Sequence, residues 1–166
     1  MNSVSAEQAS RLAELKDCVV EAAKTVCRVT CLADLQVKDD DQKGADGAVL
    51  AVFSLTGDLA WTVYLGLPRA TVPSIAEAFA GYPVAFDSPD MGDAISELAN
   101  VFAAETKASL ARRDVHVATS LPGVLRTEGL EILVQHNASA VKMYYASPFG
   151  PLWTAVAAGR GEGFVA

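Results

Sequence analysis

From Ser88 to Arg112 the chain reads SPDMGDAISELANVFAAETKASLAR, and this stretch predicts a long helix. Ser88 is a residue type that caps helices, and Pro89 suits the first turn because its missing amide has no partner there. Apolar residues then recur at spacings of three and four, the pattern of a helix with one buried side. The residues that this pattern turns toward a core are Ile95, Leu98, Phe102 and Thr106. We expect the helix to end at Ala111 or Arg112.

The opposite side of this predicted helix carries a polar stripe. At about 100° per residue, an arc of roughly 80° holds Asp93, Glu97, Asn100, Ala104 and Lys107. A solvated face usually carries long charged side chains that pair at i, i+4. This one places an asparagine, a poor helix former, in mid-helix and short alanines beside it, which permits another surface to approach closely. The stripe is therefore either a contact surface or an ordinary solvated face.

Two further helices are expected earlier in the chain. The first runs from Ala6 to about Val29, where apolar residues again recur at helical spacing. The second is short. Pro68 is expected to begin it, because a first helical turn tolerates a missing amide, and Gly81 is expected to end it.

Extended segments account for most of the remaining chain. Two apolar runs are expected to form a hairpin in which Gly57-Asp58 is a two-residue type II′ turn. The predicted strands are Asp34–Lys38, Ala48–Leu55, Leu59–Leu67, Val115–Ser120, Gly129–His136, Ala140–Ala146 and Leu152–Ala158. Helices that punctuate antiparallel strands indicate an α+β fold, an α/β sandwich in which a largely antiparallel sheet packs against long helices.

The composition limits the classes of function. A length of 166 residues suits a single domain, 1–166, in which 159–166 are expected to be a flexible tail. The balance of 13 basic and 20 acidic residues, a net charge of −7, repels phosphate backbones and anionic lipid. We therefore expect neither nucleic acid nor membrane as a partner. The first residues hold no basic and apolar leader, which predicts a cytoplasmic protein.

The cysteines do not suggest a disulfide scaffold or a metal site. They are three, an odd number, and they lie close together at Cys18, Cys27 and Cys31. A metal site at Cys27 and Cys31 lacks two further ligands nearby, since His116 and His136 are far along the chain. We expect reduced thiols that act as small buried side chains, and neither a metal site nor a cofactor of the chain's own.

The polar stripe resembles a known signature. Asp93-x3-Glu97-x2-Asn100, followed after 21 residues by Pro122, is similar to the motif of the CheC/CheX/FliY family of chemotaxis phosphatases, and the CheX branch is the most similar. The order of helices and strands also fits, so that the resemblance covers roughly Gln8 to Ala158. It implies a CheC-like fold built from two pseudo-symmetric halves.

The resemblance also implies an activity and a set of roles. The chain would accelerate hydrolysis of the aspartyl phosphate on a phosphorylated CheY-type response regulator, which itself supplies magnesium. Asn100 would hold the attacking water, because an amide both donates and accepts hydrogen bonds, and Glu97 would pair with the regulator's lysine. The residues expected to contact the partner are Asp93, Ser96, Ala103, Ala104 and Lys107. Pro122 would have a structural role.

Two departures from the family pattern leave a second hypothesis open. Relatives often have glycine and a second asparagine where this chain has Ala104 and Glu105. The alternative is therefore a catalytically silent adaptor that binds a response regulator or a histidine kinase. CheX-type proteins are dimers, so we also expect a homodimer. Tyr144, Tyr145 and Trp153 would line its interface, unless they are simply core.

The first predicted helix holds an echo of the stripe. Asp17-x3-Glu21-x2-Lys24 repeats the spacing of the stripe 76 residues earlier, with lysine in place of asparagine. The echo is either a coincidence of charged helices or the trace of two related halves. Under the second interpretation Lys24 marks a site that has lost its amide, because a lysine cannot accept a hydrogen bond from water. We then expect one functional stripe per chain.

Overall fold

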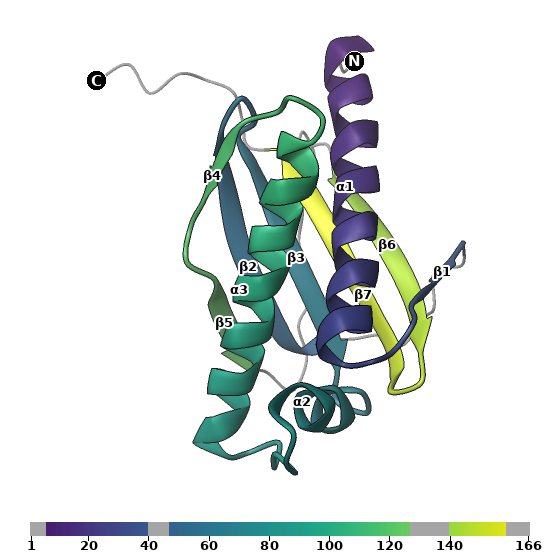
Figure 1. Ribbon diagram of the computed structural model, residues 1–166, viewed down its shortest axis with the longest axis vertical. Helices are drawn as coiled ribbons and strands as arrows, with labels where there is room; N and C mark the ends of the chain where they lie inside the picture. Colours follow the sequence, from purple (N-terminus) through teal and green to yellow (C-terminus); the bar gives the residue numbers. More distant parts are fainter. Residues whose placement is uncertain (1–5, 40–46, 127–139, 159–166) are drawn as a thin grey trace.

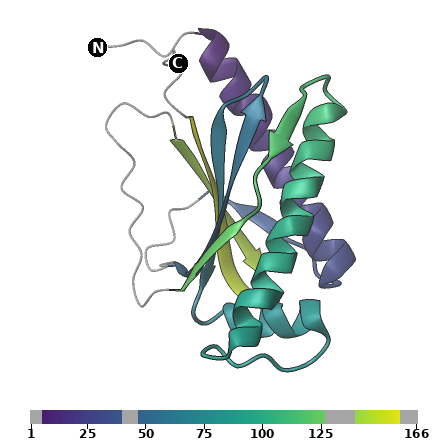
Figure 2. The same cartoon turned by 90° about the vertical axis from the view of Figure 1, so that its left-hand side faces the viewer.

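The computed structural model describes residues 6–39, 47–126 and 140–158. Within them, in chain order, lie α1 (Ala6–Thr30), β1 (Gln36–Lys38), β2 (Gly47–Gly57), β3 (Trp61–Pro68), α2 (Val72–Ala80), α3 (Pro89–Ala111), β4 (Val117–Thr119), β5 (Gly123–Arg126), β6 (Ala140–Ser147) and β7 (Gly150–Ala158). The strands form one antiparallel sheet, and all three helices lie on the same side of it (Figures 1 and 2). The predicted α+β architecture is confirmed.

The sheet is built from two equivalent halves. Its strand order is β1-β6-β7-β3-β2-β4, with β5 also paired to β2. If β1 is exchanged with β4, β2 with β6 and β3 with β7, the same order is read from the other end. One long helix precedes each half: α1 comes before β1, β2 and β3, and α3 comes before β4, β6 and β7 and the additional strand β5. The helices α1 and α3 lie side by side and antiparallel (Figure 1). The expected pseudo-symmetry is therefore present in the topology.

The two long helices match residue by residue. The hydrophobic core residues of α1 are Leu15, Cys18, Val19, Ala22, Ala23, Val26 and Cys27. A shift of 76 turns this set into Met91, Ala94, Ile95, Leu98, Ala99, Phe102 and Ala103, all of which are buried in α3. Seven matches out of seven at the offset of the D-x3-E-x2 echo favour two related halves over coincidence.

The hairpin of β2 and β3 is confirmed, but its predicted two-residue turn is wrong. β2 continues to Gly57 and β3 begins at Trp61, so the three residues 58–60 connect the strands, and the last pair that faces across the hairpin is Leu55 and Trp61. Gly57 is needed for another reason. Its φ is +127°, and a Cβ there would lie 2.6 Å from the carbonyl oxygen of His116, beside β4. The glycine thus permits the close approach of a third strand.

The prediction that α2 begins at Pro68 is wrong. Pro68 is the last residue of β3 and pairs with Gly47, and a turn in which the Thr71 amide donates to the Pro68 carbonyl separates it from the helix. Pro73 occupies the first turn of α2 instead. The other boundaries are confirmed: Gly81 ends α2 in a left-handed conformation, and Ser88 is the N-cap residue of α3.

The predicted strand at Val115–Ser120 is present as β4, whereas β5 was missed. Both pair with the same edge of β2, and the three residues 120–122 stand opposite Phe53 and Ser54. Ser120 closes this bulge, because its hydroxyl accepts a hydrogen bond from the Ser54 amide over 2.9 Å. Pro122 lies in the bulge, where a ladder needs no amide. The predicted strand Gly129–His136 lies outside the described residues, as do residues 159–166.

Both faces of β7 are buried. Leu152 and Val156 belong to the core between sheet and helices, whereas Trp153 and Ala155 form a smaller cluster on the opposite face. Trp153 and Tyr145 are each 1% exposed, so the expectation that they line a dimer interface is wrong and their core role is confirmed. Tyr144 is half-buried and packs against the cluster of Trp153. The homodimer stays a prediction.

Gly66 of β3 gives a sharp test of this packing. Replacing it with alanine would put a Cβ into the buried indole ring of Trp153. We expect Gly66→Ala to lower the free energy of unfolding by about 1–3 kcal/mol, the cost of overpacking. The matched control is Gly92→Ala in α3, where a Cβ meets no atom within 4 Å and a better helix former stabilises by up to about 1 kcal/mol. Urea unfolding of both variants measures the difference, and equal midpoints would contradict the predicted overlap.

Candidate functional site

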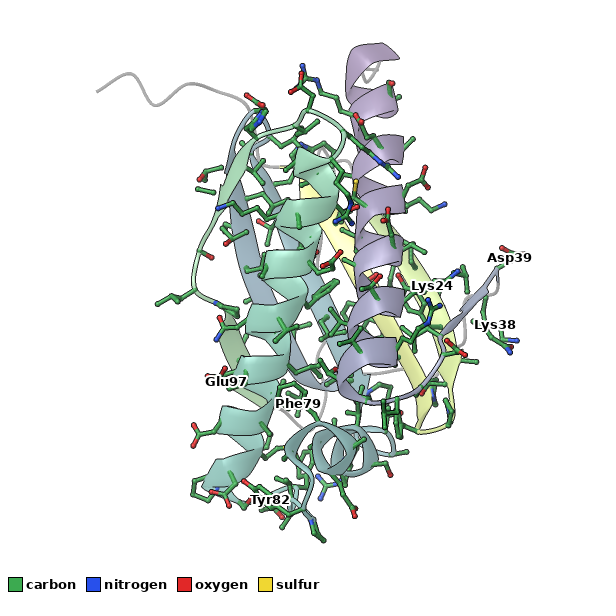
Figure 3. All side chains as sticks on the ribbon, viewed as in Figure 1. Lys24, Lys38, Asp39, Phe79, Tyr82 and Glu97 are labelled. Atoms are coloured by element: carbon green, nitrogen blue, oxygen red, sulfur yellow. The ribbon has the colours of Figure 1, made fainter. Side chains whose placement is uncertain are left out.

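The polar stripe lies along the solvent side of α3. Asp93, Glu97, Ala104 and Lys107 are exposed, and Asn100 is half-buried. Figure 3 places Glu97 on the side of α3 that faces away from α1. The predicted core side of the same helix is buried throughout, because Ile95, Leu98, Phe102 and Thr106 are at most 2% exposed.

One predicted contact residue is misplaced. Ala103 is 3% exposed and packs in the hydrophobic core, so it offers no surface to a partner. Its angle on the helix explains the error. Residue 103 follows Phe102 and lies at the border of the buried arc, where tertiary packing decides whether a side chain is covered. Ser96, seven residues earlier, lies at the same border of the stripe and is half-buried.

Glu97 and Asn100 are the chemically useful members of the stripe. They are three residues apart, which puts their side chains on neighbouring turns of one helix face. Neither forms a hydrogen bond or an ion pair with another residue in the described part of the chain. An accessible carboxylate can pair with a cation, and a carboxamide can hold a water between its donor and its acceptor. The pair is thus available to an incoming group.

An open groove adjoins the stripe. It is lined on the α3 side by Asp93 and Ser96 and on the sheet side by Val124 and Arg126 of β5. The Arg126 guanidinium donates to the Phe86 carbonyl over 2.6 Å, which fixes the loop before α3. Sequence reasoning missed this wall because β5 was not predicted. The alternation of Gly123–Arg126 is too short to be recognised as a strand.

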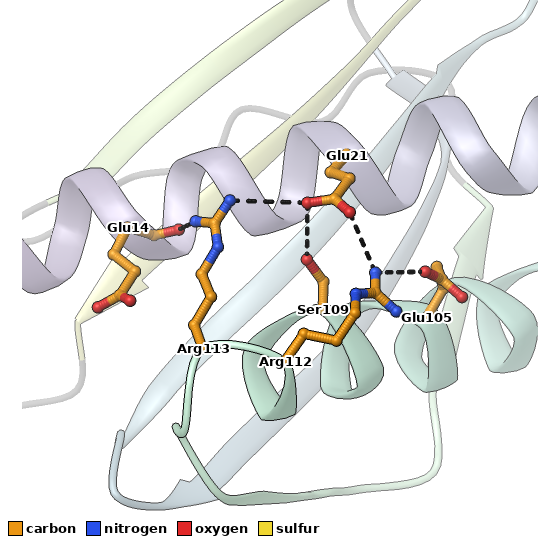
Figure 4. Close-up of polar contacts among 6 residues, drawn as sticks. All are labelled: Glu14, Glu21, Glu105, Ser109, Arg112 and Arg113. Atoms are coloured by element: carbon orange, nitrogen blue, oxygen red, sulfur yellow. Dashed lines mark hydrogen bonds and ion pairs between the residues drawn. The ribbon is translucent and has the colours of Figure 1, made fainter.

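The echo on α1 has a different environment. The Glu21 carboxylate accepts hydrogen bonds from Arg112 at 3.1 Å and from Ser109 at 3.1 Å, and Arg113 lies 3.6 Å away (Figure 4). Arg112 also pairs with Glu105 at 3.0 Å. The hydrogen bonds from Ser109 and Arg112 lower the pKa of the Glu21 carboxyl. Glu21 therefore ties α1 to the last turns of α3.

Glu105, one of the two departures from the family pattern, is part of the same ion-pair network. Its pairing with Arg112 places its carboxylate on the α1 side of α3, away from the stripe. The other departure, Ala104, is exposed within the stripe itself. Of the two residues, only Ala104 can therefore affect how closely a partner approaches the face that holds Asn100.

Within the described ranges, no three side chains of His, Cys, Asp or Glu come together in a way that could hold a metal ion. The cysteines Cys18, Cys27 and Cys31 are unpaired and buried, which confirms their role as small core side chains. None of the described helices combines the length and apolar character needed to cross a membrane.

Comparison with solved structures supports the fold. The CheX chemotaxis protein from Vibrio vulnificus superposes with a TM-score of 0.76 at 15% identity, covering 86% of this chain and 95% of that one. The CheX protein from Desulfovibrio desulfuricans gives a TM-score of 0.75 at 18% identity, with 88% and 99% covered. A CheX–CheY–BeF3–Mg²⁺ complex from Borrelia burgdorferi gives 0.68 at 16% identity, with 87% and 96% covered.

Sequence comparison gives the family. No curated protein sequence matches the chain. The sequence model of the family described as "Chemotaxis phosphatase CheX", however, matches residues 49–146, more than half of the chain and the whole of the polar stripe. The protein therefore belongs to the CheX family of chemotaxis phosphatases.

Proposed function

We propose that this protein accelerates dephosphorylation of a phosphorylated CheY-type response regulator. The observation that carries the proposal is the unpaired Glu97–Asn100 face on the solvent side of α3. The family assignment supports the reaction class, and the related complex from Borrelia burgdorferi pairs a CheX protein with CheY, BeF3 and Mg²⁺. The substrate would be the aspartyl phosphate of the regulator.

The proposed reaction requires few chemical groups from the phosphatase itself. A water oxygen forms a bond to phosphorus while the bond from phosphorus to the aspartate oxygen breaks, and the electron pair of that bond leaves on the carboxylate. The water loses its proton to solvent or phosphate. Asn100 would orient this water by donating one hydrogen bond and accepting another. A magnesium ion held by the regulator would neutralise charge on the phosphoryl oxygens.

Glu97 would fix the register of docking. Its exposed carboxylate is placed to form an ion pair with a lysine of the regulator, which directs the helix face toward the phosphoryl group. Asp93, Ser96, Ala104 and Lys107 would contact the rim of the partner. The short Ala104 side chain keeps the approach close, although it adds a methyl group relative to glycine.

The direct test is a dephosphorylation assay. Purified protein is mixed with a phosphorylated CheY-type regulator and magnesium, and release of inorganic phosphate is followed over time. We expect phosphate release at least about tenfold faster than the regulator's own decay, since positioning of one reactant contributes at least that much. Decay that is unchanged at saturating protein would reject the phosphatase.

The same assay, together with a binding measurement, distinguishes the phosphatase from the adaptor. The exposed Ala104 methyl group favours the adaptor. An adaptor would bind the beryllofluoride-activated regulator without accelerating decay of the phosphorylated one. Isothermal titration measures the first property and phosphate release the second. Binding together with turnover would remove the adaptor, whereas binding alone would replace the phosphatase with it.

A further inference from the structure

Docking on the polar stripe requires more surface than one helix face supplies. A stable protein–protein interface buries about 800 Å² on each partner and involves about 20–30 residues a side. The stripe is one row of side chains along α3, so a partner that covers Asn100 must also contact an element beside the helix. Two such elements lie next to α3: α1 on one side, and the edge formed by β4 and β5 on the other (Figure 1).

The site face of α3 is turned toward the edge formed by β4 and β5. Asn100 and Glu105 are five residues apart, which separates their side chains by about 140° around the helix. Glu105 pairs with Arg112, which also binds α1, so Asn100 points away from α1. On the other side of α3, the open groove is lined both by Ser96 of the stripe and by Val124 of β5. A partner seated on Asn100 therefore extends over β4 and β5.

Leu121 presents an apolar side chain at this edge. It lies in the bulge 120–122 between β4 and β5, and it is 88% exposed. Phe53, opposite the bulge, packs edge-on against Phe102 with ring centroids 5.6 Å apart. The bulge is therefore level with the middle of α3, near the turn that carries Asn100. Both cartoon views show the segment between β4 and β5 running alongside α3 (Figures 1 and 2).

The alternation of side chains along the strand puts Leu121 on the helix side of the sheet. Successive side chains of a strand point to opposite faces. Thr119 pairs with the core residue Leu55 and therefore lies on the helix side. Ser120 then faces away from the helices, and Leu121 returns to their side. Leu121 and the polar stripe are thus accessible to one partner from the same direction.

Hydrogen bonds hold the bulge in place. The Ser120 amide donates to the Ser54 carbonyl over 3.0 Å, and the Ser54 amide donates to the Ser120 hydroxyl over 2.9 Å. The same hydroxyl donates to the carbonyl of Leu121, and the ring of Pro122 fixes the φ of the next residue. Because this backbone is already ordered, a partner that covers Leu121 does not have to order the loop, which favours binding.

We propose that Leu121 is an apolar anchor for the response regulator, and that it packs against an apolar patch beside the regulator's phosphorylation pocket. The inference rests on the proposed function of the α3 face. The roles proposed for Glu97 and Asn100 use groups that the phosphorylation chemistry itself requires, whereas an apolar patch outside the pocket can differ between regulators. Leu121 therefore contributes to affinity and to the choice of regulator, and not to the chemical step.

The test compares two exposed leucines. We expect Leu121→Ala to raise the dissociation constant for a beryllofluoride-activated CheY-type regulator with magnesium by about tenfold, the effect of losing one buried leucine side chain. The regulator concentration for half-maximal phosphate release should rise by the same factor. The maximal rate should stay within about twofold, because the lost contact stabilises ground state and transition state equally.

The matched control is Leu125→Ala. Leu125 is 51% exposed, but it pairs with Leu50, whose cluster lies on the sheet face away from the helices. Its replacement should change neither the dissociation constant nor the rate. Leu121→Met keeps an apolar side chain of similar volume and should retain the wild-type affinity. Titration calorimetry measures binding, and phosphate release measures turnover.

The anchor and the proposed function fail in different ways. Equal dissociation constants for wild type, Leu121→Ala and Leu125→Ala would overturn the anchor and leave the phosphatase intact. If wild type binds the regulator without accelerating its decay, the phosphatase is rejected, and a weaker Leu121→Ala complex still supports the anchor. A wild-type chain that does not bind overturns both. Sedimentation of the free chains covers the remaining occupant: a dimeric wild type with a monomeric Leu121→Ala variant would show that a second copy covers Leu121, against the proposal.

Discussion

Asn100→Ala is expected to slow phosphate release from the phosphorylated regulator by about 100-fold or more, the loss that follows removal of one positioned hydrogen-bonding group from a catalytic site. The amide has no described partner within the chain and is half-buried, so its removal should cost the fold little. Phosphate release under saturating regulator measures the effect. The regulator's own decay sets the floor.

Matched variants separate catalysis from binding. Lys24→Ala changes the equivalent, half-buried position on α1 and should leave the rate unchanged. Glu97→Ala should instead weaken association, so that the concentration for half-maximal rate rises more than the maximal rate falls. An Asn100→Ala chain within twofold of wild type would show that the water is held elsewhere.

Phe102→Ala is expected to lower the free energy of unfolding by about 3–5 kcal/mol, the cost of removing a buried aromatic ring and leaving a cavity. Phe102 is 2% exposed, and its ring packs edge-on against Phe53 with centroids 5.6 Å apart at 82°. It already borders a small apolar cavity between the helices and the sheet, so little nearby can move in to fill the space. A urea unfolding curve measures the change.

The control for this variant is a substitution at the preceding residue, Val101. Val101 is 38% exposed, and Val101→Ala should change the free energy of unfolding by no more than about 0.5 kcal/mol, the usual range for surface substitutions. Similar losses for both variants would mean that α3 is held by its backbone rather than by the packing of one side. Phe102 and Asn100 lie on the same helix, α3. Phosphate release should therefore also fall at temperatures at which the Phe102→Ala variant begins to unfold.

Sequence patterns worked best where one physical rule acts over many residues. The long helices α1 and α3 were predicted close to their observed bounds, because an apolar repeat of three and four over some twenty residues has few other solutions. Glu97 and Asn100 were placed together on an accessible face for the same reason. The wrong predictions are those that rested on the type of a single residue. Pro68 and Gly57 are local signals that suit more than one structure.

Tertiary contacts decided the rest. A glycine is required at position 57 because the carbonyl of His116, which is distant in sequence, lies too close for a Cβ. The strand β5 forms because it pairs with the edge of β2. Ala103 is buried although it neighbours the stripe, because tertiary packing covers that border of α3.

The sequence by itself determined the two long helices, the polar stripe and the repeat at 76 residues, because these follow from the angular spacing of residues along one helix. Only the tertiary structure decided that Glu21 is tethered while Glu97 is free. That difference depends on Arg112 and Arg113, which lie 91 residues or more along the chain from Glu21. No local pattern encodes which distant charges two packed helices bring together.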